Sequence, residues 1–178
     1  IDIVKAQIQI AEGAAIGSSE MIVPTQDKIT LKGSALQCRV TTEDPANNFM
    51  PGTGTIIAYR SPAGFGIRLD GGTAYSGAVI SPYYDSLLVK VTTWGNTPEE
   101  SIERMDRALR EFRIRGVSTN LSFVENVINH PKFIAGDYTT QFIDQNPELF
   151  HLRERQDRSN LMLKFLGDIA VNGNPELE

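Results

Sequence analysis

A formal net charge of -5 on 178 residues argues against a nucleic-acid or anionic-membrane binder, because such proteins need a dense basic face. The hydrophobic fraction of 40% and the charged fraction of 22% are typical of a globular protein with one sizeable core. No apolar run approaches the roughly 20 residues of a membrane span, and the single cysteine excludes an internal disulfide framework and is typical of a reducing compartment.

The first predicted element is a helix over residues 1–12. Ile1, Val4 and Ile8 fall near one helical face, and Gly13 provides a stop. No N-cap residue precedes Ile1, so we expect the helix to have lost its start and the chain to be a piece of a longer polypeptide.

A strand is predicted over residues 35–42. Leu36, Cys38 and Val40 alternate there with polar residues, which is the period-2 pattern of a strand with one buried face. The pattern makes Cys38 a small buried hydrophobic residue and not a nucleophile, and it places Arg39 on the polar face. Such an arginine is either a surface ion-pair partner or a site residue aimed at an anion, and the pattern alone favours the surface pair.

Glycine-rich turns separate the strands predicted next, at residues 55–60, 67–70 and 81–95. The stretches GTGTI and GFGIRLDGG look like phosphate-binding loops, but they lack the P-loop lysine and the dinucleotide-binding spacing, so we predict turns. Phe65 stands between two glycines near Arg68. An aromatic residue beside an arginine is the composition of an interface anchor, although a phenylalanine packed onto its own core is the alternative.

The remaining polar candidates are few. His130 and His151 lie far from the lone cysteine in sequence and lack the ligand spacing of a metal site, so we predict no metal site and no nucleophilic triad. The acidic pair at 43–44 is followed by a proline and predicts a turn. Asp85 either pairs with an arginine or caps a local turn.

The clearest helix follows Thr97. Thr97 at the N-cap, Pro98 at the first helical position and Glu100 at the third form a capping box. The predicted inward stripe of this helix consists of Ile102, Met105, Ala108, Leu109 and Phe112. We expect the helix to end at Gly116 and a second helix to run over residues 118–130.

The end of the chain differs in composition from the rest. Residues 151–160 are a polar charge run, and residues 161–173 are apolar again but too few to form a core. We therefore predict one domain over residues 1–150 and a linker toward another domain over residues 151–178. The predicted fold class of the domain is α+β, with antiparallel strands and two or three flanking helices.

Five ordered motifs resemble the C-terminal subdomain of biotin carboxylase, a module of the biotin-dependent carboxylases. They are ALQCRVTTEDP, FMPGTGTI, GFGIRLD, PYYDSLLVKV and FRIRGVSTN, and the resemblance covers about residues 1–145. It implies the fold of that subdomain without the ATP-grasp part, which precedes this region in the family. EFRIRGVSTNLSFVENVINHPKF and TTQFIDQNPELF are most similar to the pyruvate carboxylase branch, and the tail resembles its linker toward the carboxyltransferase domain.

The resemblance implies an ATP- and biotin-dependent ligase. In that family ATP activates bicarbonate, biotin is carboxylated, and the carboxyl group passes to pyruvate to give oxaloacetate. Arg39 matches the family arginine that contacts the ureido oxygen of biotin and stabilises its enolate. Phe65 and Arg68 match residues of the biotin carboxylase dimer interface, and Asp85 is expected to join it. Gln37 stands where many relatives carry glutamate, so it is a poor candidate for an essential carboxylate.

The implied cofactors are biotin, together with ATP and Mg bound by parts of the enzyme outside this chain, so we expect the chain alone to be inactive. The implied partners are a second copy in a biotin carboxylase dimer within a homo-tetramer and the biotin carrier domain of the same enzyme, with no nucleic acid and no membrane. The expected location is cytoplasmic, or the mitochondrial matrix in a eukaryote.

An alternative from a different class is a non-catalytic assembly module of an acetyl-CoA or propionyl-CoA type biotin-dependent carboxylase. In that case Phe65 and Arg68 carry the function, and Arg39 is only a structural ion-pair partner.

Overall fold

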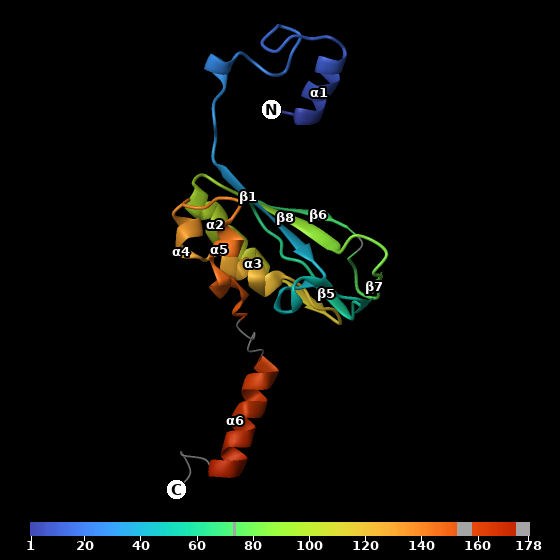
Figure 1. Ribbon diagram of the computed structural model, residues 1–178, viewed down its shortest axis with the longest axis vertical. Coiled ribbons are helices and arrows are strands. Elements are labelled where there is room, and N and C mark those ends of the chain that lie inside the picture. The colour runs from blue at the N-terminus through green and yellow to red at the C-terminus, as the bar shows by residue number, and fades with distance from the viewer. Residues whose placement is uncertain (73, 153–157, 174–178) are drawn as a thin grey trace.

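The computed structural model describes residues 1–72, 74–152 and 158–173 of the chain, and Figure 1 shows a central body with α1 at one end and α6 at the other. The helices are α1 (Ile3–Ala11), η1 (Gln26–Lys28), η2 (Pro45–Asn47), α2 (Pro98–Glu111), α3 (Leu121–Ile128), α4 (Pro131–Ile134), α5 (Phe142–Gln145), η3 (Pro147–Phe150) and α6 (Arg158–Asn172). The strands are β1 (Ser34–Thr41), β2 (Glu43–Asp44), β3 (Met50–Pro51), β4 (Gly54–Thr55), β5 (Ala58–Arg60), β6 (Ile67–Gly71), β7 (Val79–Ile80), β8 (Leu87–Gly95) and β9 (Arg113–Arg115). Short antiparallel strands with flanking helices confirm the predicted α+β class.

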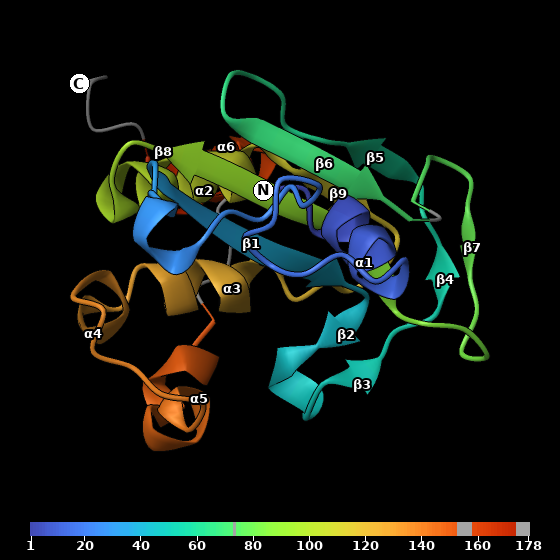
Figure 2. The same cartoon turned by 90° about the horizontal axis from the view of Figure 1, so that it is seen from above.

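The main sheet is antiparallel and has the strand order β1–β8–β6 (Figure 2). β8 confirms the second part of the strand predicted over residues 81–95, whereas residues 81–86 are not strand. Its buried residues Val89 and Val91 pack toward the core. Two-stranded antiparallel pairs, β2–β3, β4–β7 and β5–β9, extend the structure beyond this sheet.

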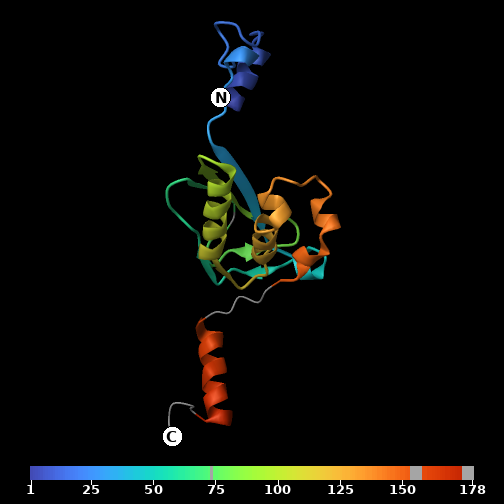
Figure 3. The ribbon, with the colours of Figure 1, turned by 90° about the vertical axis from the view of Figure 1, so that its left-hand side faces the viewer.

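Helix α2 covers one face of the main sheet, and α3 lies alongside α2 (Figure 3). The α2 helix begins as predicted, because the Thr97 side chain accepts a hydrogen bond from the Glu100 backbone N–H at 3.3 Å. The Glu100 carboxylate accepts one from the backbone N–H of Asn96, one residue further back than in a standard capping box. Four of the five predicted stripe residues are buried, and Ile102 is partly buried against them.

The prediction that this helix ends at Gly116 is wrong. α2 ends at Glu111, and residues 113–115 leave the helix to form β9, which pairs with β5. Gly116 follows with a backbone φ of +97°, a left-handed conformation that glycine adopts easily, and so it turns the chain after the strand. The pairing with a distant strand therefore ends the helix before the glycine is reached.

The predicted strand at residues 55–60 is two strands in the structure. β4 pairs with β7, whereas β5 pairs with β9. The change of partner falls at Ile56 and Ile57, whose backbone N–H groups donate to the carbonyls of Ala78 and Arg115 respectively. One continuous β-prone run therefore serves two different sheets.

Helix α1 has an N-cap, contrary to the prediction. The Asp2 side chain accepts a hydrogen bond from the Lys5 backbone N–H at 3.0 Å, so the helix begins immediately after Asp2. It ends before Gly13, which has a φ of +95°. Ala6 is the buried residue of this helix, whereas Ile3, Val4 and other apolar side chains are exposed.

The core lies between α2 and the main sheet. Its largest fully buried side chains include those of Phe112, Met105, Leu109, Leu88 and Val40. A smaller aromatic cluster joins α3 to α5 and η3 around Phe123, Phe142 and Leu149. Residues 153–157, at the centre of the predicted charge run, lie outside the described residues, so the linker over 151–178 stays a prediction.

Candidate functional site

Arg39 lies on β1 between two buried residues, as the alternation predicts. Cys38 is 7% exposed and Val40 is fully buried, whereas the Arg39 side chain is 58% exposed. Burial raises the pKa of the Cys38 thiol to about 12, so this cysteine is protonated at neutral pH and is no nucleophile. The strand thus turns its unreactive cysteine inward and its guanidinium outward.

A cavity of about 440 Å³ lies beside Arg39. It is lined by Arg39, Thr41, Glu43, Asp85, Ser86 and Asn120. These residues come from β1, β2, the loop before β8 and the N-terminus of α3, so segments that are far apart in sequence meet here. The lining combines one cation with two carboxylates and three neutral polar groups.

Asp85 makes both of the contacts that the sequence left open as alternatives. One carboxylate oxygen accepts a hydrogen bond from the Leu87 backbone N–H at 2.8 Å, which closes a local turn. The other oxygen lies 3.8 Å from Nη2 of Arg39. This contact is long, and the Asp85 side chain is 72% exposed, so it restrains the guanidinium only weakly.

Glu43 has a larger place in the cavity than its predicted turn suggested. Its carboxylate accepts hydrogen bonds from the Ser86 hydroxyl at 2.8 Å and from the Thr41 hydroxyl at 3.1 Å. These two bonds tie the end of β1 to the start of β8. No local pattern indicates this role, because Ser86 lies 43 residues away.

The exposed face of the main sheet brings Arg39 and Arg68 into neighbouring rows. Arg39 is opposite Lys90 on β8, and Lys90 is opposite Asp70 on β6. In the next row, Gln37 and Arg68 are both opposite Thr92 of β8, and the Gln37 amide donates to the Thr92 hydroxyl. Opposed residues in an antiparallel pair share a face of the sheet.

Phe65 lies in the turn before β6 and is fully exposed, which contradicts the alternative that it packs onto its own core. Gly66 next to it has a φ of +74° and accepts a hydrogen bond from the Trp94 backbone N–H at its carbonyl. The Arg68 side chain is exposed and pairs with Asp70 at 2.9 Å, and this pairing raises the pKa of the guanidinium. The glycine stretch is therefore a turn, as predicted.

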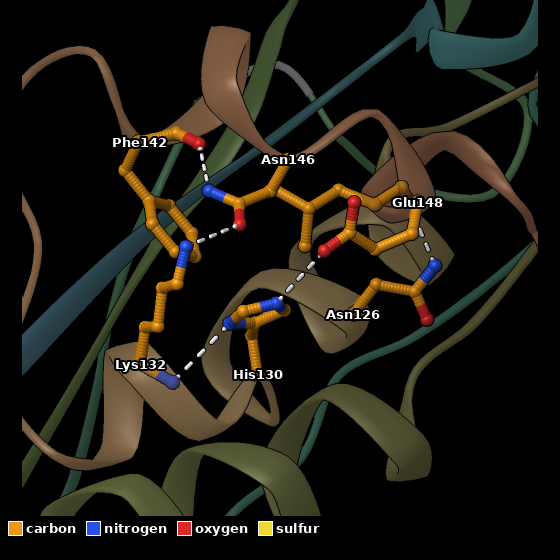
Figure 4. A network of polar contacts seen from close by, with 7 residues as sticks. Asn126, His130, Lys132, Phe142, Asn146 and Glu148 are labelled. Carbon is orange, nitrogen blue, oxygen red and sulfur yellow. Dashed lines mark hydrogen bonds and ion pairs between the residues drawn. The ribbon is translucent and has the colours of Figure 1, made fainter.

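A second cavity, of about 550 Å³, lies away from Arg39 between α3, α4 and η3. It contains both histidines, which the sequence spacing did not place together. Figure 4 shows that its polar groups bond to one another: Nδ1 of His130 accepts from the Lys132 backbone N–H, and Nε2 lies 3.1 Å from the Glu148 carboxylate. A hydrogen bond from its own backbone N–H and the contact with His130 lower the pKa of Glu148. These contacts join α4 to η3 and have the character of a structural network.

Among the described residues, no group of three or more histidine, cysteine, aspartate or glutamate side chains is arranged to hold a metal ion. In the same parts of the chain, none of the helices combines the length and the apolar character that crossing a membrane requires.

Residues 37–145 match the family described as Biotin carboxylase C-terminal domain. The chain is 54% identical over 178 residues to a pyruvate carboxylase of Staphylococcus aureus, covering 100% of this chain and 16% of that protein. It is 52% identical over 173 residues to the mitochondrial pyruvate carboxylase of Homo sapiens, covering 97% of this chain and 14% of that one. The chain thus spans about one sixth of the length of the curated relatives it matches.

Solved structures agree with these relatives. The crystal structure of a complete multifunctional pyruvate carboxylase from Rhizobium etli matches with a TM-score of 0.80 and 64% identity, over 98% of this chain and 16% of that one. The biotin carboxylase subunit of a pyruvate carboxylase matches with a TM-score of 0.74 and 40% identity, over 86% of this chain and 33% of that one.

Proposed function

Because the chain belongs to the biotin carboxylase C-terminal domain family, we propose that it forms part of the biotin carboxylase region of a pyruvate carboxylase. The names of its relatives support this assignment, and all of them are much longer than the chain. The whole enzyme would use ATP to activate bicarbonate, carboxylate biotin and transfer the carboxyl group to pyruvate, giving oxaloacetate. ATP and Mg would be bound by parts of that enzyme outside this chain.

Arg39 is the residue that we assign to the biotin step. The observation that carries this assignment is an exposed guanidinium on β1, at the edge of a cavity of about 440 Å³. Its donors suit the ureido oxygen of biotin, and among the described residues the side-chain contact that holds them is the long one to Asp85. Biotin supplies a ureido nitrogen that carries the carboxyl group. The Arg39 guanidinium would be in place to stabilise negative charge on the ureido oxygen.

Bicarbonate-dependent ATP cleavage in the presence of free biotin tests this role in the full-length enzyme. Arg39→Ala should lower the biotin-stimulated rate by about 10²- to 10³-fold, the usual cost of removing one donor to a developing oxyanion. Arg107→Ala is the matched control, because Arg107 is a similarly exposed arginine that pairs with a carboxylate on α2, and it should leave the rate unchanged. A wild-type rate in Arg39→Ala would overturn the assignment.

We also propose a second role for the chain, as one side of the biotin carboxylase dimer. The fully exposed Phe65 favours it, since aromatic residues are enriched in protein–protein interfaces. Arg68 lies nearby on the edge strand β6, and Asp85 would join the same surface less directly. In this proposal the partner is a second copy of the enzyme, within a homo-tetramer.

Sedimentation of the full-length enzyme tests the dimer surface. Arg68→Glu and Phe65→Ser should shift the enzyme toward smaller species, whereas Asp144→Lys, a charge reversal at an exposed position of α5 away from β6 (Figure 2), should not. Unchanged sedimentation of both interface variants at low micromolar concentration would refute this role. Both readings expect this shift, so it is the activity of Arg39→Ala that separates a catalytic chain from the assembly-only alternative, in which that variant would retain activity.

The remaining proposals follow from the family. We place the domain boundary near residue 150 and assign residues 151–178 to the linker toward the carboxyltransferase domain. The biotin carrier domain of the same enzyme would deliver biotin to Arg39. A cytoplasmic location, or the mitochondrial matrix in a eukaryote, completes the proposal.

A further inference from the structure

The strand that carries Arg39 becomes irregular directly after it. β1 and β8 pair residue by residue from Ser34 to Val40, with Arg39 opposite Lys90. The register then shifts, so that Thr41 is opposite Leu87. Such irregularities bend a strand and change the direction of neighbouring side chains, and they commonly stand next to functional sites. Beyond the shift the Thr42 N–H still donates to the Ser86 carbonyl at 2.9 Å, but β1 is an edge strand, and within the described residues no strand pairs with its other side.

Asn120, at the start of α3, supports the backbone at this point. Its side-chain amide donates to the Arg39 carbonyl at 3.0 Å, and its side-chain oxygen accepts from the Thr41 backbone N–H at 2.9 Å. Its own backbone N–H donates to the Thr41 carbonyl at 3.2 Å. One residue thus satisfies three backbone groups on either side of Val40, as a neighbouring strand would do.

Because Asn120 is buried, the loss of these hydrogen bonds would be costly. The residue is 8% exposed, so a side-chain amide that lost its partners would be stranded away from water, at a cost of about 1–3 kcal/mol. Both ends of the amide are occupied by backbone groups of β1, which fixes its orientation. The position of α3 and the position of the Arg39 backbone are therefore coupled.

The direction of the Arg39 side chain depends mainly on this backbone. In the part of the chain that the structure describes, the contact of the guanidinium itself is the exposed one with Asp85 at 3.8 Å. Asn120 also lines the same cavity as Arg39. We propose that Asn120 is a positioning residue, which holds the end of β1 so that the Arg39 guanidinium points into the cavity where biotin would react. This inference rests on the proposed function of Arg39.

A double-mutant experiment in the full-length enzyme tests whether Asn120 acts through Arg39. Asn120→Ala should lower kcat/KM for free biotin by about tenfold to a hundredfold, the range expected for a misplaced reacting group, with the KM for ATP unchanged. In the Arg39→Ala background, Asn120→Ala should cause no further loss. If instead the two losses multiply, Asn120 acts independently of Arg39 and the proposal is overturned.

Hydrogen exchange followed by mass spectrometry gives a second measurement that does not depend on activity. Asn120→Ala should speed amide exchange in peptides covering residues 38–44, because the Thr41 N–H loses its acceptor. Unchanged exchange there would overturn the positioning role. If Arg39→Ala kept wild-type activity while exchange still rose in Asn120→Ala, the proposed function would fail and the structural link would stand.

Asn146 provides the matched control. It is 3% exposed, donates its side-chain amide to the Phe142 carbonyl and accepts from the Lys132 ammonium, in the network drawn in Figure 4. Asn146→Ala should lower the melting temperature similarly, while sparing both the biotin kinetics and exchange over residues 38–44. An equal loss of biotin activity in this variant would reduce Asn120 to a general stabilising residue.

Asn120→Asp serves where the alanine variant does not fold. Aspartate keeps an oxygen for the Thr41 N–H but loses the donor to the Arg39 carbonyl and sets a carboxylate against it. It should show the same biotin-specific loss, and a wild-type kcat/KM for biotin in Asn120→Asp would overturn the proposal.

Discussion

The contact between Asp85 and Arg39 is a test of how much an exposed ion pair contributes to the site. Nη2 of Arg39 and the Asp85 oxygen are 3.8 Å apart, and the two side chains are 58% and 72% exposed. At this distance in water the Coulomb attraction is about 1 kcal/mol, and measured exposed pairs contribute about 0–1 kcal/mol. The substitution Asp85→Asn removes the charge and keeps an oxygen that can accept from the Leu87 N–H.

We therefore expect Asp85→Asn to change kcat/KM for free biotin by at most about fivefold, which corresponds to about 1 kcal/mol. Arg39→Ala should lose about 10²- to 10³-fold. The small effect of Asp85→Asn should shrink further in 0.5 M salt, because exposed charges are screened over less than about 10 Å above 0.1 M.

The assay is biotin-stimulated ATP cleavage by the full-length enzyme at two salt concentrations. Sedimentation is measured on the same samples, so that a loss of dimer is not mistaken for a loss of chemistry. A hundredfold loss in Asp85→Asn, or one that salt does not reduce, would refute the reasoning, since it would mean that the pair is desolvated in the working enzyme.

Two further predictions concern the scaffold of the site. The thiol of Cys38 should react slowly with Ellman's reagent at pH 8, because it is 7% exposed and burial raises its pKa to about 12. In the unfolded chain the thiol ionises with a pKa near 9.0, whereas in the folded protein it stays protonated. The free energy of unfolding should therefore fall as the pH rises from about 9 toward 12. Cys38→Ala should remove the part of this decline that the thiol causes. Rapid labelling of the folded protein at pH 8 would contradict this prediction. Gly116→Ala should lower the melting temperature strongly, because the residue has a φ of +97° and an added Cβ would lie 2.1 Å from the Thr55 carbonyl oxygen. Gly136→Ala is the control, because Gly136 has a similar φ of +73° but no atom lies within 4 Å of the added Cβ. Equal melting temperatures for the two variants would show that the contact with Thr55 does not matter.

The elements that could be predicted from the sequence are those determined by nearby residues. The start of α2 is an example, because Thr97, Pro98 and Glu100 form the cap within four positions. The end of the same helix could not be predicted, because residues 113–115 leave it to pair with β5, which lies more than 50 residues earlier. The split of residues 55–60 between two sheets has the same cause, since the partners of β4 and β5 come from different parts of the chain.

The same distinction between local and distant residues holds for the candidate site. Alternation along β1 correctly put Cys38 inside and Arg39 outside, because the period of a strand is a local property. The groups that hold Arg39 in place are not local: Asn120 reaches its carbonyl across 81 residues. The alternation in sequence therefore predicts which face of the strand a side chain lies on. Its orientation on that face also depends on residues distant in sequence, which no local pattern identifies. If Asn120 controls that orientation, the precision of the biotin step depends on how α3 is packed against the sheet, and substitutions in α3 that never touch the cavity should change the KM for biotin before they change the KM for ATP.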